Sequence, residues 1–157
     1  MAAVKAAPEL VALGKDGRGE QRFTPRAMIE TEQRLERATS VMANRDQHGV
    51  AERQRDVALA RAAARGMFLS PEQRSAFDHV TEAKGLGVVI GYAGTGKSAM
   101  LGVACEAWEG AGYSVRGVAL SGIAAENLES GSGIASRTIA SLDGNRGGSS
   151  SPIAMCW

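Results

Sequence analysis

The chain has 157 residues, a length that suits one domain, and its formal net charge of +1 excludes a global basic field for nucleic acid. Its two cysteines, Cys105 and Cys156, have neither metal-ligand spacing nor the pattern of a disulfide scaffold. No apolar run approaches the length of a membrane span and no secretory leader is recognisable, so we expect a cytoplasmic protein without membrane insertion.

The N-terminal part of the chain divides into two stretches of different character. Residues 1–23 include a glycine-rich run of mixed charge, which predicts a linker or the cut edge of a longer protein. Residues 24–66 predict a helical segment, with Thr24 as N-cap and Pro25 at the first helical position. His48 lies in a break between two helices and is interpreted as a loop residue, because no cluster of other metal ligands accompanies it.

The second of these helices is rich in arginine. We favour a solvated helix face, balanced by Glu52 and Asp56, over the alternative of a surface for DNA phosphates. The arginines concerned are Arg53, Arg55, Arg61 and Arg65.

Residues 67–142 predict an α/β unit that opens with a helix-start signal. Ser70 is placed as N-cap, Pro71 follows at the first helical position, and Gln73 lies three residues after Ser70. This S-x-x-Q pattern predicts a capping box at the start of a helix. The box is sufficient by itself to explain Gln73.

An octapeptide at residues 91–98, Gly-Tyr-Ala-Gly-Thr-Gly-Lys-Ser, matches the phosphate-binding loop pattern G-x-x-x-x-G-K-[S/T] at every position. The β-branched run at 87–90 predicts a buried parallel strand before it, and residues 99–108 predict a helix after it. Lys97 is suited to reach the β- and γ-phosphates, and the Ser98 hydroxyl to bind Mg²⁺. We therefore expect a nucleoside triphosphate site in which Lys97 and Ser98 are the catalytic pair. Its binding residues are Gly91, Ala93, Gly94, Thr95, Gly96, Lys97 and Ser98.

A second strand is expected at 114–120, which completes a right-handed strand–helix–strand crossover. Small residues and a helix start then follow at 121–128, at the sheet edge where ligands bind in open α/β sheets. Close approach of a nucleic-acid backbone and plain helix–sheet packing are equally good explanations of these small residues. Residues 133–142 predict a glycine turn and a short helix capped near Ser136, and residues 143–157 lose all periodicity and read as a low-complexity tail.

Four segments taken in order carry a family resemblance. They are 68–74 (Phe-Leu-Ser-Pro-Glu-Gln-Arg), 88–98, 119–128 and 133–142. Together they resemble consecutive motifs of the helicase part of Ti-type conjugative relaxases, the TraA kind of the MobA/MobL group, with a superfamily 1 motor close to the RecD-like branch. The resemblance covers residues 24–142. It implies a partial RecA-like P-loop NTPase lobe with a parallel sheet, preceded by a helical segment.

The resemblance implies a role for particular residues. Gln73 would read the adenine edge and favour ATP over GTP as the nucleotide bound with Mg²⁺. Single-stranded DNA would contact the residues after the second strand, although Ile123 stands where relatives often carry Lys or Arg. The parent protein's partners would be the relaxosome and the type IV secretion coupling machinery. The implied DNA-binding residues are Ser121, Gly122, Ala124, Ala125 and Thr138.

The sequence departs from the family in what it lacks. No Asp-Glu pair follows an apolar run after Leu142, and neither the second-lobe arginines nor the nicking domain is recognisable. We therefore expect a fragment that binds ATP but hydrolyses it poorly. A small P-loop kinase or NTPase is an alternative that needs its own acid, for which Asp143 is the nearest residue. A non-catalytic interaction module with a vestigial P-loop is the other alternative.

Overall fold

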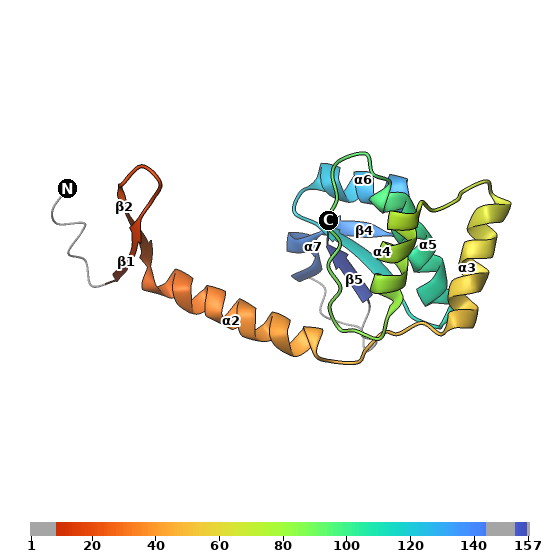
Figure 1. Cartoon of the computed structure of the whole chain (residues 1–157), viewed down its shortest axis with the longest axis horizontal. Helices are drawn as coiled ribbons and strands as arrows, with labels where there is room; N and C mark the ends of the chain where they lie inside the picture. The colour runs from red at the N-terminus through yellow and green to blue at the C-terminus, as the bar shows by residue number, and fades with distance from the viewer. Residues whose placement is uncertain (1–8, 144–152, 157) are drawn as a thin grey trace. The chain divides into compact units, whose positions relative to one another are not determined.

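The computed structural model describes residues 9–143 and 153–156, with side chains for residues 9–141. The described chain divides into two compact units, Met1–Asn44 and Arg45–Trp157, each of which is considered by itself (Figure 1). Helix α3 therefore belongs to the second unit, together with the P-loop, rather than to the N-terminal helical segment expected from the sequence. Within the described residues, no helix is both long and apolar enough to cross a bilayer.

The first unit is a hairpin followed by a helix. Strands β1 (Leu10–Lys15) and β2 (Gln21–Pro25) pair antiparallel, and α2 (Arg26–Ala43) begins directly after β2. The Asp16 carboxylate closes the turn, because it accepts N–H bonds from Arg18 at 2.9 Å and from Glu20 at 3.0 Å. The expected linker is therefore partly a hairpin. The helix starts one residue later than expected, with Pro25 and not Thr24 as its N-cap.

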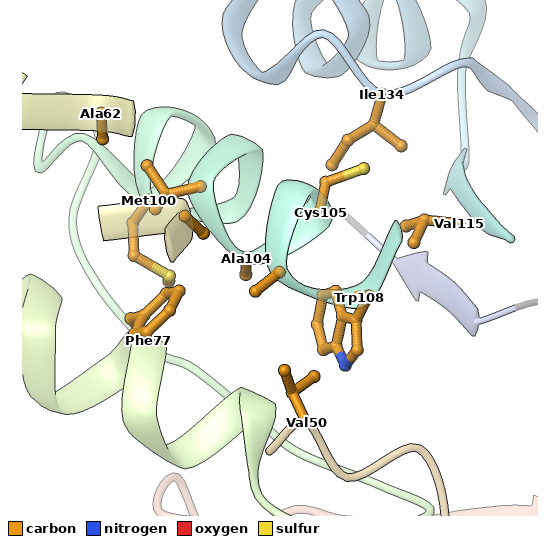
Figure 2. Packing of buried hydrophobic residues seen from close by; sticks show 12 residues of the cluster. Val50, Ala62, Phe77, Met100, Ala104, Cys105, Trp108, Val115 and Ile134 are labelled. Atoms are coloured by element: carbon orange, nitrogen blue, oxygen red, sulfur yellow. The ribbon is translucent and has the colours of Figure 1, made fainter. Parts of the chain in front are cut away.

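The second unit is built around helix α5 (Lys97–Gly110), against which α3 (Glu52–Ala64) and α4 (Pro71–Thr81) pack (Figure 1). The buried face of α5 includes Met100, Ala104 and Trp108, at the helical spacing expected of a core face. Figure 2 shows Met100 next to Phe77 of α4, which is fully buried. Residues of α3, α4 and α5 thus share one hydrophobic core.

The loop before α3 is fastened to the end of α5. The Trp108 indole donates a hydrogen bond to the His48 carbonyl at 3.1 Å, and the Tyr113 hydroxyl donates to the Gly49 carbonyl at 3.4 Å. The rings of His48 and Tyr113 meet edge to face. These contacts confirm His48 as a loop residue, held with its φ at 59°.

The sheet of this unit is parallel and three-stranded in the order β4-β3-β5. Strand β3 (Val115–Ala119) is central, between β4 (Ser136–Thr138) and β5 (Ile153–Cys156). Helix α6 (Gly122–Ser132) forms the crossover from β3 to β4 and contacts both strands, and the short α7 (Ile139–Asp143) follows β4.

Three local predictions are wrong. Residues 87–90 form no strand, and Val88 and Ile90 are 64% and 94% exposed. A physical reason is that both sides of β3 are already occupied, by β4 and β5, so this run has no place beside the central strand. Residues 136–138 pair as a strand instead of starting a helix, and residues 153–156, expected in the tail, are also a strand. The rest of that tail, 144–152 and Trp157, lies outside the described residues.

Candidate functional site

The octapeptide forms a glycine-dependent loop that leads directly into α5. Gly94 and Gly96 have φ values of +79° and +73°, in the left-handed region that favours glycine, and Gly96 is the N-cap of the helix. The first N–H in the helix ladder is that of Met100, which bonds to the Gly96 carbonyl at 3.0 Å. The helix entrance therefore presents N–H groups and a positive dipole end, which suit a phosphate.

Two side chains of the loop brace it from within. The Lys97 ammonium donates to the carbonyls of Gly91 and Tyr92, both at 2.7 Å, and the Thr95 hydroxyl donates to the same Tyr92 carbonyl at 2.9 Å. A side chain at Gly91 would press on Thr95 and Lys97. Ala93 is exposed. Lys97 is half-buried against the loop. A phosphate bound there would have to replace the two carbonyls as the acceptor of its ammonium group.

Ser98 is the candidate metal ligand of the loop. It lies in the first turn of α5, half-buried, next to Gly131 near the end of α6. A Cβ at Gly131 would lie 2.9 Å from the Ser98 Cβ and 3.2 Å from its Oγ. A hydroxyl is a suitable hard ligand for Mg²⁺, which usually takes few protein ligands and completes its shell with phosphates and water. No cluster of three or more His, Cys, Asp or Glu side chains in the described residues offers an alternative metal site.

Gln73 reaches the loop from the start of α4. The predicted capping box is confirmed: the Gln73 N–H bonds to Ser70 Oγ at 3.3 Å, and Gln73 Oε1 accepts the Ser70 N–H at 2.9 Å. The remaining amide group, Nε2, donates to the Thr95 carbonyl at 2.9 Å. Glu72 also joins this helix start, because its own N–H and the Ser70 hydroxyl hold the pKa of its carboxyl below the usual range.

The implied DNA-contacting residues gather at the carboxyl ends of β3 and β4. These parallel strands pair in a register that sets Ala119 opposite Thr138. Ser121 and Gly122 follow the end of β3, and Thr138 is the last residue of β4. Ser121 is the N-cap of α6 and its hydroxyl accepts the Ala124 N–H at 3.2 Å. The Thr138 hydroxyl accepts the Ser141 N–H at 3.3 Å, as a cap for α7. All of these groups belong to one sheet edge.

The backbone N–H groups in the first turn of α6 differ in whether they are already hydrogen-bonded. The Ala124 N–H is capped by Ser121, the Ala125 N–H bonds to the Ser121 carbonyl, and the Ala125 side chain is 5% exposed. No hydrogen bond in the described residues uses the N–H of Gly122 or Ile123, and the Ile123 side chain is 73% exposed. The Ala125 side chain therefore belongs to the core. The N–H groups of Gly122 and Ile123 are the ones in this turn that an anion would meet.

Two of the arginines in and directly after α3 form ion pairs with carboxylates. Arg55 lies 3.9 Å from Asp78 of α4, and Arg65 forms an ion pair with Glu106 of α5. The partners are acids of neighbouring helices and not Glu52 and Asp56, which the sequence suggested. The solvated face and the DNA surface both stay predictions. The Gln73–Thr95 bond and the Ser98–Gly131 contact had no signal in the sequence, because both depend on how separate helices pack.

Comparison with known proteins places the chain among P-loop proteins. The AAA domain family matches residues 68–154. The chain is 42% identical over 135 residues to the probable conjugal transfer protein TraA of Sinorhizobium fredii, and 43% identical over 122 residues to the conjugal transfer protein TraA of Rhizobium radiobacter. It is 38% identical over 149 residues to the conjugal transfer protein TraA of Agrobacterium fabrum.

These alignments cover 78–89% of this chain but only 11–13% of each relative. The chain therefore corresponds to a small segment of much longer proteins. No solved structure matches it significantly.

Proposed function

We propose that this chain, which belongs to the AAA domain family and so has a P-loop NTPase fold, binds ATP with Mg²⁺ at residues 91–98. The observation that carries the proposal is the loop itself. Two glycines in the left-handed region shape it, and Lys97 and Ser98 stand in the first turn of the helix that follows. Lys97 would bind the β- and γ-phosphates, Ser98 would bind Mg²⁺, and the metal would neutralise phosphate charge.

We further propose that the described unit is part of a RecA-like lobe of a conjugative relaxase-helicase, which moves on single-stranded DNA in the cytoplasm during plasmid transfer. The relatives named conjugal transfer proteins support this role, since the match extends over most of this chain. DNA would lie on the edge formed by Ser121, Gly122 and Thr138, where neighbouring strand ends meet. The relaxosome and the secretion coupling machinery would be partners of the full-length protein.

The described residues favour binding over hydrolysis. Hydrolysis needs an acid at a strand end to hold Mg²⁺ and polarise water. Leu120 and Ser121 follow β3, and Ile139 follows β4, so neither strand end supplies a carboxylate. The same lack weakens the kinase alternative, because Asp143 is the last residue of the short helix α7 and not the end of a strand.

Nucleotide binding is tested by calorimetric titration of Mg·ATP into the wild type and Lys97→Ala. Loss of a charged contact to phosphate costs about 1.5–3 kcal/mol, or about 10- to 150-fold in affinity. Lys84→Ala is a matched control, because Lys84 pairs with Glu82 and makes no hydrogen bond or ion pair to the loop within the described residues. Equal affinities for wild type and Lys97→Ala would show that the loop is vestigial and would support a non-catalytic module.

DNA binding is tested by fluorescence titration with an unstructured single-stranded oligonucleotide at low salt, where phosphate contacts are strongest. Ser121→Asp keeps a good N-cap but sets a negative charge at the proposed phosphate position, while Ser121→Asn keeps the cap without the charge. We expect the first variant to lose affinity and the second to retain it. No binding by the wild type, or equal binding by both variants, would contradict the DNA edge.

A further inference from the structure

Gln73 occupies a position between two parts of the molecule. Its Oε1 accepts the Ser70 N–H at 2.9 Å, which fixes the side chain at the start of α4. Its Nε2 donates to the Thr95 carbonyl at 2.9 Å, inside the P-loop. One amide group therefore joins the cap of a helix to the loop that is proposed to hold the triphosphate.

The loop needs such a support because the segment before it has none from the sheet. Residues 87–90 pair with no strand in the described chain, and Ile90 is 94% exposed. The loop is braced internally by the Lys97 and Thr95 side chains, which bond to carbonyls within the loop itself. The bond from Gln73 differs because it comes from another helix, which is packed on the core through Phe77.

The fit between Gln73 and the loop is close. A Cβ on Gly96 would overlap the Gln73 amide nitrogen, and Gly96 is in the left-handed region with φ at +73°. Gly96 is therefore glycine for two independent reasons, its backbone conformation and the space that Gln73 takes. Gly94 is also left-handed, but a Cβ on it would meet nothing within 4 Å.

We propose that Gln73 is a positioning residue for the phosphate loop: it holds the Thr95–Gly96 turn in the conformation that receives the triphosphate. This role rests on the proposed nucleotide site. It adds the contact between Gln73 and Thr95, which acts on the phosphate loop whatever base the nucleotide carries. Each amide atom has one further hydrogen-bonding position, so Gln73 can touch a base without leaving the loop. The two roles differ in which ligands they affect.

The experiment measures Mg²⁺-dependent affinities for ATP, GTP and inorganic tripolyphosphate, using the full chain. Gln73→Met keeps the side-chain length but has no amide group, so it removes the bond to Thr95 and also the bond from the Ser70 N–H. Ser70→Ala is the control, because it removes the hydroxyl half of the capping box and leaves the Gln73 amide in place. Thermal unfolding of both variants shows whether α4 stays folded.

We expect Gln73→Met to weaken ATP, GTP and tripolyphosphate by the same factor, about two- to tenfold for one hydrogen bond, while Ser70→Ala leaves all three affinities unchanged. A loss confined to ATP would overturn the positioning role and assign Gln73 to the base. An equal loss in Ser70→Ala, or no loss in Gln73→Met, would also overturn it. If the wild type binds none of the three ligands while remaining folded, the nucleotide site itself fails and the positioning role fails with it.

Discussion

The sharpest test of the loop geometry is a comparison of Gly94→Ala with Gly96→Ala. Both residues are left-handed, so alanine at either position costs about 1–2 kcal/mol of backbone strain. The loop is exposed at Gly94 and half-buried at Gly96, so the strain is expected to be relieved locally in the free protein. The same strain lowers the affinity for Mg·ATP, because binding requires the loop to return to the left-handed conformation. Gly94→Ala should therefore bind Mg·ATP about 5- to 30-fold more weakly.

Gly96→Ala has a second cost that Gly94→Ala lacks. The new methyl group overlaps the Gln73 amide, which must leave its 2.9 Å bond to Thr95 at a further cost of about 0.5–1.5 kcal/mol. Its affinity should fall about 2- to 10-fold below that of Gly94→Ala, as measured by titration calorimetry. When Gln73→Met is also present, the new methyl group meets a side chain of similar size but breaks no hydrogen bond. The difference in affinity between Gly96→Ala and Gly94→Ala should then become smaller. Equal losses in the two glycine variants would refute the role assigned to Gln73.

Three further predictions concern stability. Phe77→Ala should lower the free energy of unfolding in urea by about 3–5 kcal/mol, while Phe68→Ala should change it by less than about 0.5 kcal/mol, because Phe77 is fully buried and Phe68 is 78% exposed. Burial, with a smaller contribution from Glu109, raises the pKa of Cys105 to about 12 from an ordinary 9.0, so the unfolded chain loses its thiol proton first. The stability contributed by the neutral thiol should then be lost between about pH 9 and 12, a slope that Cys105→Ala removes, and a slope that persists in that variant would contradict the assignment. Deletion of residues 1–44 should leave the melting temperature of the remaining unit unchanged, and a drop of several degrees would show that the two units are coupled.

The sequence predicted helices better than strands, for a physical reason. The capping box at Ser70 and the helix after Lys97 depend on residues close in sequence, and both are confirmed. A strand needs a partner, and the run at 87–90 has β-branched residues but no neighbour in the described sheet. The strand at Ser136–Thr138 was missed for the opposite reason, since its pairing with β3 is not written in three local residues.

The site shows the same division between local and long-range information. The left-handed glycines and the position of Lys97 follow from the octapeptide alone. The burial of Ala125 was readable in principle, because it lies three residues before the buried Leu128 on the same helix face. The bond from Gln73 to Thr95 was not readable, since it joins residues 22 positions apart through the packing of two helices.

The exposed run at 87–90 has a consequence for handling the protein. Val88 and Ile90 face water, and no charged residue lies between Lys84 and Lys97 to keep neighbouring molecules apart. Such a stretch has the β propensity that favours intermolecular strand pairing, and charges or prolines are what usually prevent it. The glycines at 87 and 91 lower the tendency of this run to form a strand. Aggregation should therefore increase with protein concentration, and Ile90→Lys should reduce it.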